Sequence, residues 1–238
     1  MRYKRVLLKL SGQAVSGNQE VGFDPDALEH IADQVLGLRT QGVEISIVIG
    51  GGNIFRGTLS AQWGIERAEA DNIGMMGTVL NSLMLRGVLS SKGNGDVEVR
   101  VMTAIPINTI AEPFIRLRAI HHLEKGYIVI FAGGTGNPYF TTDTAASLRA
   151  MEIGADVIFK ATKVDGIYSS DPRTDKSAVK YDELTYIDVL KKGLKVMDST
   201  SVSLCMDNKL PMVIFNVNQR YSIKRVLLGE KLGTTVGA

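Results

Sequence analysis

Short apolar runs, rich in β-branched residues, alternate along this chain with longer segments in which apolar residues recur every three or four positions. The short runs are typical of buried strands. The expected strands are Arg5–Leu10, Val43–Ile49, Val97–Met102, Tyr127–Phe131, Asp156–Lys160, Met212–Asn216 and Gly233–Val236. Strands that alternate with helices predict an α/β fold with a mostly parallel sheet covered on both faces.

The longer segments have the spacing of amphipathic helices, as in Leu28, Ile31, Val35 and Leu38. The expected helices begin at Asp24-Pro25, Asp71, Glu112-Pro113, Asp143, Tyr186, Ser201 and Ile223. An Asp before a Pro is a strong start signal, because Asp caps the free N–H groups and Pro fits the first helical position. Gly42 and Gly126 mark the ends of the first and third helices.

Composition narrows the class of protein. The 238 residues are 45% hydrophobic, enough for one large α/β domain or two small ones. Lys and Arg number 27 against 25 Asp and Glu, a balance that argues against a general nucleic-acid-binding protein. Cys205 is the single cysteine, which excludes a disulfide framework and a CxxC zinc site. No apolar run approaches the length of a membrane span, and no signal-like region follows the N-terminus, so we expect a cytoplasmic protein.

The segment Tyr127–Ala146 combines several features of a ligand site. Its buried strand leads into Gly133, Gly134 and Gly136, which allow a close approach of the backbone to a ligand. Asp143 then lies at the start of a helix, where free N–H groups favour an anion. A carboxylate and a phosphate repel each other unless a cation or a lysine lies between them. The segment therefore suggests metal–nucleotide chemistry; the alternative is an ordinary tight turn between a strand and a helix.

Lys9 lies at the end of a predicted buried strand and is followed by Ser11 and Gly12. An unpaired ammonium is costly to bury there, and ligands of open α/β sheets bind at the carboxyl ends of strands. We therefore favour a functional Lys9 over a lysine that only extends to solvent.

A second glycine turn, Gly50–Gly52, follows the next strand, with Arg56 close behind as a bidentate phosphate donor. Thr58-Leu59 stands where a P-loop requires Lys-Ser/Thr, so this is not a Walker motif.

A polar loop, 161–172, follows the strand Asp156–Lys160. In it Tyr168 could cover an adenine and Lys163 could contact phosphate; a plain surface loop is the alternative. His121 and His122 are expected to be residues of a helix end, and we predict no metal ligands among the side chains.

Four motifs occur in one order along the chain: KLSG at Lys9–Gly12, IGGGNIFRG at Ile49–Gly57, GTGNPYFTTD at Gly134–Asp143 and KATKVDGIY at Lys160–Tyr168. VMD at Val196–Asp198 is a weaker match. With these motifs the chain resembles the amino acid kinase superfamily, and most closely the bacterial UMP kinases. The third motif is quite specific to the UMP kinases, whereas KLSG and the triple glycine are shared across the superfamily.

The resemblance implies a three-layer α/β/α sandwich, a single domain over residues 1–238. Residues up to about 150 would form the UMP side and residues from about 151 the ATP side. It also implies the reaction ATP + UMP → ADP + UDP with Mg²⁺ in pyrimidine nucleotide synthesis, a homohexamer, and GTP and UTP as effectors. Ser90 and Arg116 stand where GTP-responsive members have His and Trp, and Lys92–Asp96 looks like an insertion. These departures argue against GTP activation.

The resemblance also implies site residues. ATP would contact Lys9, Leu10, Ser11, Gly12, Gly52, Arg56, Thr162, Tyr168 and Asp171. UMP would contact Gly51, Asp71, Thr135, Gly136, Asn137, Pro138, Tyr139, Phe140, Thr141 and Thr142. For catalysis, we expect Lys9 to neutralise the transferred phosphoryl group and Asp143 to orient Lys9 and a Mg²⁺-bound water. Arg56 would supply further donors, and Lys163 is a second candidate cation.

Two other functions use the same motifs. A kinase that makes acyl phosphates, such as an acetylglutamate or aspartate kinase, would share Lys9 and the triple glycine but should lack Thr135, Asn137 and Thr142. A non-catalytic nucleotide- or oxyanion-binding protein of the same fold, such as a molybdenum storage protein, should lack the Lys9 and Asp143 pair. All five residues are present.

Overall fold

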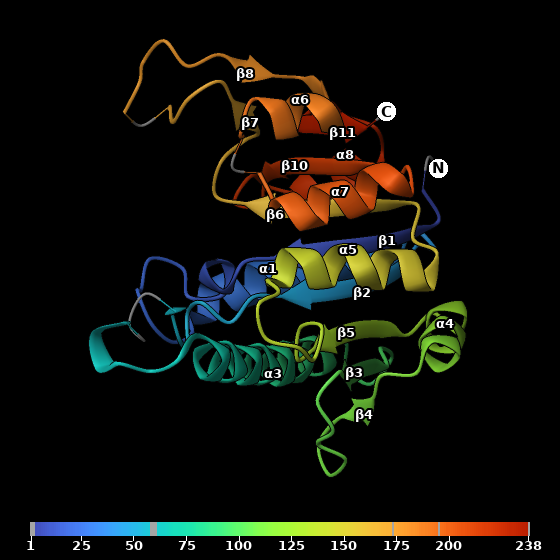
Figure 1. Ribbon diagram of the computed structural model, residues 1–238. Coiled ribbons are helices and arrows are strands. Elements are labelled where there is room, and N and C mark those ends of the chain that lie inside the picture. Colours follow the sequence, from blue (N-terminus) through green and yellow to red (C-terminus); the bar gives the residue numbers. More distant parts are fainter. Residues whose placement is uncertain (1–2, 58–60, 173, 195, 238) are drawn as a thin grey trace.

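A nine-stranded sheet forms the middle layer of the computed structural model, which describes residues 3–57, 61–172, 174–194 and 196–237 (Figure 1). Its order is β4-β3-β5-β2-β1-β6-β10-β11-β9. In chain order the strands are β1 (Arg5–Leu10), β2 (Glu44–Ile49), β3 (Val99–Thr103), β4 (Glu112–Pro113), β5 (Ile128–Ala132), β6 (Val157–Thr162), β9 (Glu183–Thr185), β10 (Met212–Asn216) and β11 (Thr234–Gly237). Among these described strands only β10 and β11 pair in antiparallel fashion, so the predicted mostly parallel sheet is confirmed.

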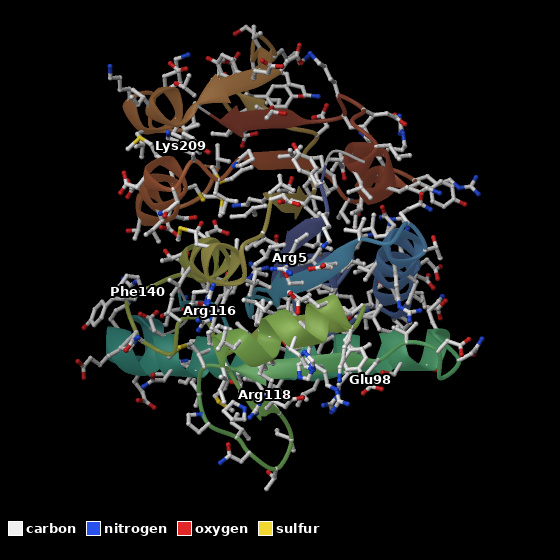
Figure 2. All side chains as sticks on the ribbon, turned by 90° about the vertical axis from the view of Figure 1, so that its right-hand side faces the viewer. Arg5, Glu98, Arg116, Arg118, Phe140 and Lys209 are labelled. Carbon is white, nitrogen blue, oxygen red and sulfur yellow. The ribbon has the colours of Figure 1, made fainter. Side chains whose placement is uncertain are left out.

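Helices cover both faces of the sheet (Figures 1 and 2). They are α1 (Pro25–Arg39), α3 (Arg67–Lys92), α4 (Arg116–Glu124), α5 (Thr142–Ile153), α6 (Tyr186–Lys191), α7 (Ser199–Asp207) and α8 (Ser222–Leu227). The buried residues of α1, α3 and α8 share one hydrophobic cluster, and those of α4, α5, α6 and α7 share another. Cys205 is fully buried in the second cluster, as expected for a small core residue. The architecture is therefore a three-layer α/β/α sandwich.

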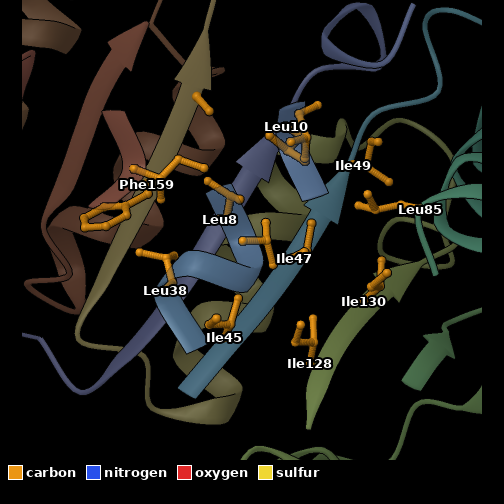
Figure 3. Close-up of a cluster of buried hydrophobic side chains, with 14 of the residues drawn as sticks. Leu8, Leu10, Leu38, Ile45, Ile47, Ile49, Leu85, Ile128, Ile130 and Phe159 are labelled. Carbon is orange, nitrogen blue, oxygen red and sulfur yellow. The ribbon is translucent and has the colours of Figure 1, made fainter. Parts of the chain in front are cut away.

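Alternation along the central strands supplies both clusters. Successive side chains of a strand point to opposite faces, so Leu8 packs toward α1 while Leu7 packs toward α5. Figure 3 shows Leu8 and Leu10 with Ile45, Ile47 and Ile49 of β2 in the first cluster. Both faces of these strands are covered, which explains why β1 and β2 read as nearly continuous apolar runs.

Strand β1 lies in the middle of the sheet, between β2 and β6. Lys9 is paired in register with Val48 of β2 and with Lys160 of β6. Because these strands are parallel, their carboxyl ends lie at one edge of the sheet, where ligands of open α/β sheets bind. The turns that follow β1, β2, β5 and β6 therefore lie near one another.

Two local predictions differ from the structure, and several very short strands were missed. Glu112-Pro113 is not a helix start but the edge strand β4, paired with β3, and α4 begins three residues later at Arg116. Helix α3 begins at Arg67, before the predicted Asp71. The small sheet of β7 (Ile167–Tyr168) and β8 (Lys180–Tyr181), and the strand β9, were not predicted, because strands of two or three residues show no periodic pattern.

Among the described residues, one helix, α3, is long and apolar enough to cross a membrane by length and composition alone. It packs against β2, β3 and β5 and buries Val79, Leu85 and Leu89 in the first cluster, so it is a core helix of this fold. Its outer side leaves Met76, Leu80 and Met84 exposed.

Candidate active site

Two lysines bracket the Asp143 carboxylate at the carboxyl edge of the sheet. Lys9 Nζ lies 2.5 Å from Oδ1 of Asp143, and Lys160 Nζ lies 2.8 Å from Oδ2. The side chain of Lys9 is only 9% exposed, that of Lys160 13% and that of Asp143 16%. Strands β1 and β6 supply the lysines at paired positions, and the second residue of α5 supplies the carboxylate. Two positive charges and one negative charge leave the cluster with a net positive charge that favours an anion.

The pKa of Asp143 favours an ionised carboxylate in this cluster. Burial alone would raise the pKa of the Asp143 carboxyl, but the ammonium groups of Lys9 and Lys160 outweigh it and hold that pKa below its usual value. Burial lowers the pKa of Lys160 and the charge of Lys9 adds to this, although Asp143 opposes both effects. Asp143 is therefore ionised and holds two cations close together, ready to be shared with a phosphate.

The N-terminus of α5 lies beside this cluster and is fixed by Asp198. Thr141 caps α5 by accepting hydrogen bonds from the N–H groups of Asp143 (3.0 Å) and Thr144 (3.4 Å). Both threonine hydroxyls donate to Asp198, at 2.5 Å from Thr141 and 2.9 Å from Thr144. Asp198 also caps α7 by accepting from Ser201 N–H. One carboxylate thus joins the starts of two helices. The N–H groups of Asp143, Thr144 and Ala145 are already bonded to Thr141, so the N–H that the first turn of α5 can offer to an anion is that of Thr142.

The turns after β1 and β2 are in contact. A methyl group placed on Gly12 would lie 2.5 Å from Oδ1 of Asn53 and 2.8 Å from the nitrogen of Gly52. On Gly50 it would lie 3.4 Å from the Thr142 hydroxyl. Glycine is therefore required at Gly12 by close approach, and the two turns meet the start of α5 at one place.

A cavity of about 300 Å³ lies between the turn after β2, helix α3 and the loop before α5. The predicted UMP residues on its wall are Gly51, Asp71, Phe140, Thr141 and Thr142. The predicted ATP residue Gly52 lines it too. Phe140 is labelled in Figure 2. Asp71 also fixes the loop, because its Oδ2 accepts hydrogen bonds from the N–H of Tyr139 (2.8 Å) and from Nε of Arg67 (3.0 Å).

The middle of the same loop lies off the cavity wall. The hydroxyl of Thr135 makes a local turn with the backbone of Asn137, and the Asn137 side chain is exposed. Gly136 lies two residues before Pro138 and packs against Ala104. Its backbone is left-handed, with φ of 84°. Tyr139 is 62% exposed and has a left-handed backbone with φ of 72°, a conformation that costs free energy in a non-glycine residue. The uridine-reading role of these residues stays a prediction.

The predicted ATP residues follow β1 and β6. Leu10 ends β1, and Ser11 and Gly12 follow it. The hydroxyl of Thr162 donates to the carbonyl of Val164. Tyr168 donates its hydroxyl to Asp165 at 2.7 Å, which raises the pKa of Tyr168, and the carbonyl of Asp171 accepts from Thr174 and Asp175.

The two remaining predicted cations donate to backbone carbonyls, whereas the described ion pairs of Asp143 are with Lys9 and Lys160. Arg56 is exposed, and its Nε donates to the carbonyl of Gly52. Lys163 donates to the carbonyl of Gly17 at 2.6 Å. The second ammonium on Asp143 belongs instead to Lys160, which also donates to the carbonyl of Val196.

Sequence reasoning missed Lys160, Asp198, Asn53 and Asn81 as site residues. Lys160 carried the same signal as Lys9, a lysine near the carboxyl end of a buried strand. Asp198 lies in the weak VMD motif, whereas no sequence signal pointed to Asn81. His122 contacts Glu112 at 3.0 Å, and the described residues contain no group of three His, Cys, Asp or Glu side chains placed to hold a metal.

Comparisons with known proteins agree with this geometry. The profile of the amino acid kinase family matches residues 4–216. The UMP kinase from Bacillus anthracis is 52% identical, with a TM-score of 0.96, over 99% of this chain and 96% of that one. The UMP kinase from Ureaplasma parvum is 34% identical over the whole of both chains, with a TM-score of 0.93. The uridylate kinase from Archaeoglobus fulgidus is 27% identical over 98% and 99% of the two chains, with a TM-score of 0.73. The chain belongs to the amino acid kinase family.

Proposed function

We propose that this protein is a UMP kinase, a phosphotransferase that converts ATP and UMP to ADP and UDP. The observation that carries this conclusion is the 52% identity to the UMP kinase from Bacillus anthracis over 99% of the chain, with a TM-score of 0.96. The bracketed carboxylate and the adjoining cavity are the chemistry that such a reaction needs, since phosphoryl transfer depends mainly on positioning and charge neutralisation.

The reaction follows from the groups at the carboxyl edge of the sheet. An oxygen of the UMP phosphate attacks the γ-phosphorus of ATP, a P–O bond forms, and the bond from that phosphorus to the bridging oxygen breaks. ADP leaves with the electron pair. The attacking oxygen is already anionic, so no general base is needed. Lys9 and Lys160 neutralise charge on the transferred group, Asp143 holds both ammonium groups, and the N–H of Thr142 at the start of α5 donates to a phosphate oxygen.

The residues near Asp143 fit a Mg²⁺ ion that arrives with ATP. Oδ1 of Asp143 is paired with Lys9 but accepts no well-aligned hydrogen bond, and the described residues provide no cage of carboxylates. Mg²⁺ commonly keeps several waters and binds through substrate phosphates and one or two carboxylates. When bound, the ion would neutralise phosphate charge, with Asp143 positioned to accept from one of its waters.

Acceptor specificity tests the proposal directly. In a coupled assay of ADP release, we expect rapid turnover with UMP and much slower turnover with CMP, dTMP, aspartate or acetylglutamate. The greatest rate with aspartate or acetylglutamate would instead identify a kinase that makes acyl phosphates. If the protein binds nucleotides but forms no ADP with any of these acceptors, it is the non-catalytic alternative.

We also propose that the protein is a homohexamer in the cytoplasm. The exposed residues Met76, Leu80 and Met84 of α3, beside an apolar groove of about 800 Å³ between α1 and α3, support burial of this face by another subunit. Gly77 of the same helix packs within the chain and gives no such support: a methyl group there would lie 3.2 Å from the carbonyl of Gly51. GTP and UTP remain candidate effectors, and Ser90 and Arg116, both exposed, remain the reason to expect no GTP activation.

Light scattering at micromolar concentration should give a mass six times that of the 25.8 kDa chain. The physical reason is that a monomer would leave the α3 face in water. A monomeric mass in a sample with full UMP kinase activity would contradict the hexamer.

A further inference from the structure

Two asparagines, both fully buried, face each other behind the phosphate-binding turns. Asn81 comes from the middle of α3, and Asn53 comes from the end of the glycine turn after β2. Nδ2 of Asn81 donates to Oδ1 of Asn53 at 2.6 Å, and Nδ2 of Asn53 donates to Oδ1 of Asn81 at 3.1 Å. The side chains thus form a reciprocal pair of amide hydrogen bonds.

The second N–H of each amide reaches a different loop. Asn81 donates to the carbonyl of Gly50 at 2.6 Å, and Asn53 donates to the carbonyl of Gly22 at 2.9 Å. An asparagine amide has two donors, so every N–H of the pair is used. A buried network in which every member has a partner is rigid, and loss of one member leaves the others without partners.

The pair also touches the turn that follows Lys9. Since a methyl group on Gly12 would lie 2.5 Å from Oδ1 of Asn53, that amide packs directly under the Ser11-Gly12 turn. One turn of α3 earlier, the hydroxyl of Thr78 accepts from the N–H of Gly133, which opens the loop after β5. The inner side of α3 therefore supports the turns after β2 and β5 directly, and the turn after β1 through Asn53.

Packing alone does not explain why position 81 is an asparagine. Asparagine is a poorer helix former than leucine, and burial of an amide is favourable only when its hydrogen bonds are made. Ser82, the next residue, shows the simpler case: it is fully buried, but its hydroxyl donates to the backbone carbonyl of Thr78 in the same helix. Asn81 instead directs both of its N–H groups at the glycine turn.

We propose that Asn81 is a positioning residue for phosphoryl transfer, an inference that rests on the UMP kinase activity proposed above. Through Gly50 and Asn53 it sets the distance between the turn after β1, the strand that carries Lys9, and the turn after β2, which borders the cavity. Asn81 acts through these turns and does not contact the nucleotides.

The test compares Asn81→Ala with Ser82→Ala. The second variant is a matched control, because it also removes a buried polar group from α3, but that group bonds within the helix and not to a loop. Asn81→Ala should lower kcat by about 100-fold, the scale expected when reacting groups are displaced by about 1 Å. The KM values for ATP and UMP should change much less, because Asn81 does not line the cavity and the variant removes no side chain from its wall. Ser82→Ala should keep kcat near wild type. Circular dichroism and thermal unfolding of each variant check that it is folded.

A double variant separates positioning from simple destabilisation. Because Asn53 and Asn81 act as one unit, Asn53→Ala/Asn81→Ala should have a kcat no lower than the worse single variant. Should Asn81→Ala not fold, Asn81→Ser is measured in its place and should also lower kcat more than it raises KM. A folded Asn81 variant with a lower melting temperature and an unchanged kcat, or losses that multiply in the double variant, would overturn the inference. A wild-type protein that does not phosphorylate UMP would instead refute the proposed function itself.

Discussion

Lys9→Ala should lower kcat for UMP phosphorylation by at least about 100-fold. Lys9 is one of two buried ammonium groups on Asp143, and its loss leaves Lys160 alone to neutralise the transferred group. Loss of one preorganised donor costs about 10²–10³ in kcat, or about 3–4 kcal/mol of transition-state stabilisation. Steady-state kinetics with saturating ATP and UMP measure this effect.

The control is Lys231→Ala, an exposed lysine whose partner Glu183 lies on the edge strand β9. It should keep wild-type kinetics. Lys160→Ala and Lys163→Ala then identify the second cation. Of these two lysines, Lys160 forms the ion pair with Asp143 and Lys163 donates to the carbonyl of Gly17, so Lys160→Ala should cause the larger loss of kcat. Near-normal turnover of Lys9→Ala would rule out its role, and a larger effect of Lys163 would restore the assignment made from the sequence.

UMP should exceed CMP by about 10³ or more in kcat/KM, the scale at which polar sites reject a base with the wrong hydrogen-bonding groups. Uracil presents O4 and N3–H, whereas cytosine presents an amino group and a bare N3. A site that pairs with one edge leaves its own buried groups unpaired against the other, and each unpaired group costs free energy. Competition between the two substrates in one assay measures the ratio.

Variants of the loop before α5 test which residues read the base. Thr142→Val removes a hydroxyl on the cavity wall, and Asn137→Ala removes an exposed amide nearby. Both should raise KM for UMP and leave KM for ATP nearly unchanged. Asn208→Ala, an exposed asparagine after α7, is the matched control and should change neither. A wild-type protein that uses CMP as well as UMP, or loop variants that impair only ATP, would exclude uridine reading by this loop.

Lys9 and Asp143 could be predicted because each breaks a local pattern. A lysine at the end of an apolar strand and a carboxylate at an anion-favouring helix start are both costly unless they meet a partner. Lys160 gave the same signal, because it ends the predicted strand Asp156–Lys160, but it was passed over for Lys163 of the following loop. The register of β6 beside β1 places Lys160 next to Lys9, whereas Lys163 lies beyond the end of β6.

The strand order and the contacts of Asn81 and Asp198 were missed because they join segments that are far apart in the sequence. The apolar pattern predicted a mostly parallel sheet, yet nothing in it indicates that β1 lies between β2 and β6. The Asn53–Asn81 pair joins positions 28 residues apart, and Asp198 reaches Thr141 over 57 residues. Such contacts depend on how helices cross the sheet, which periodicity within one segment does not encode.

The position of β1 bears on how the chain is synthesised. Strand β1 leaves the ribosome first and gains β2 early, but its other neighbour is residues 157–162. Until β6 has emerged, a growing chain carries a central, apolar strand with one edge unpaired, the kind of edge that recruits other strands or a chaperone. Lys9 and Lys160 lie on these two strands, so the nascent protein acquires its paired lysines only when the middle of the sheet closes.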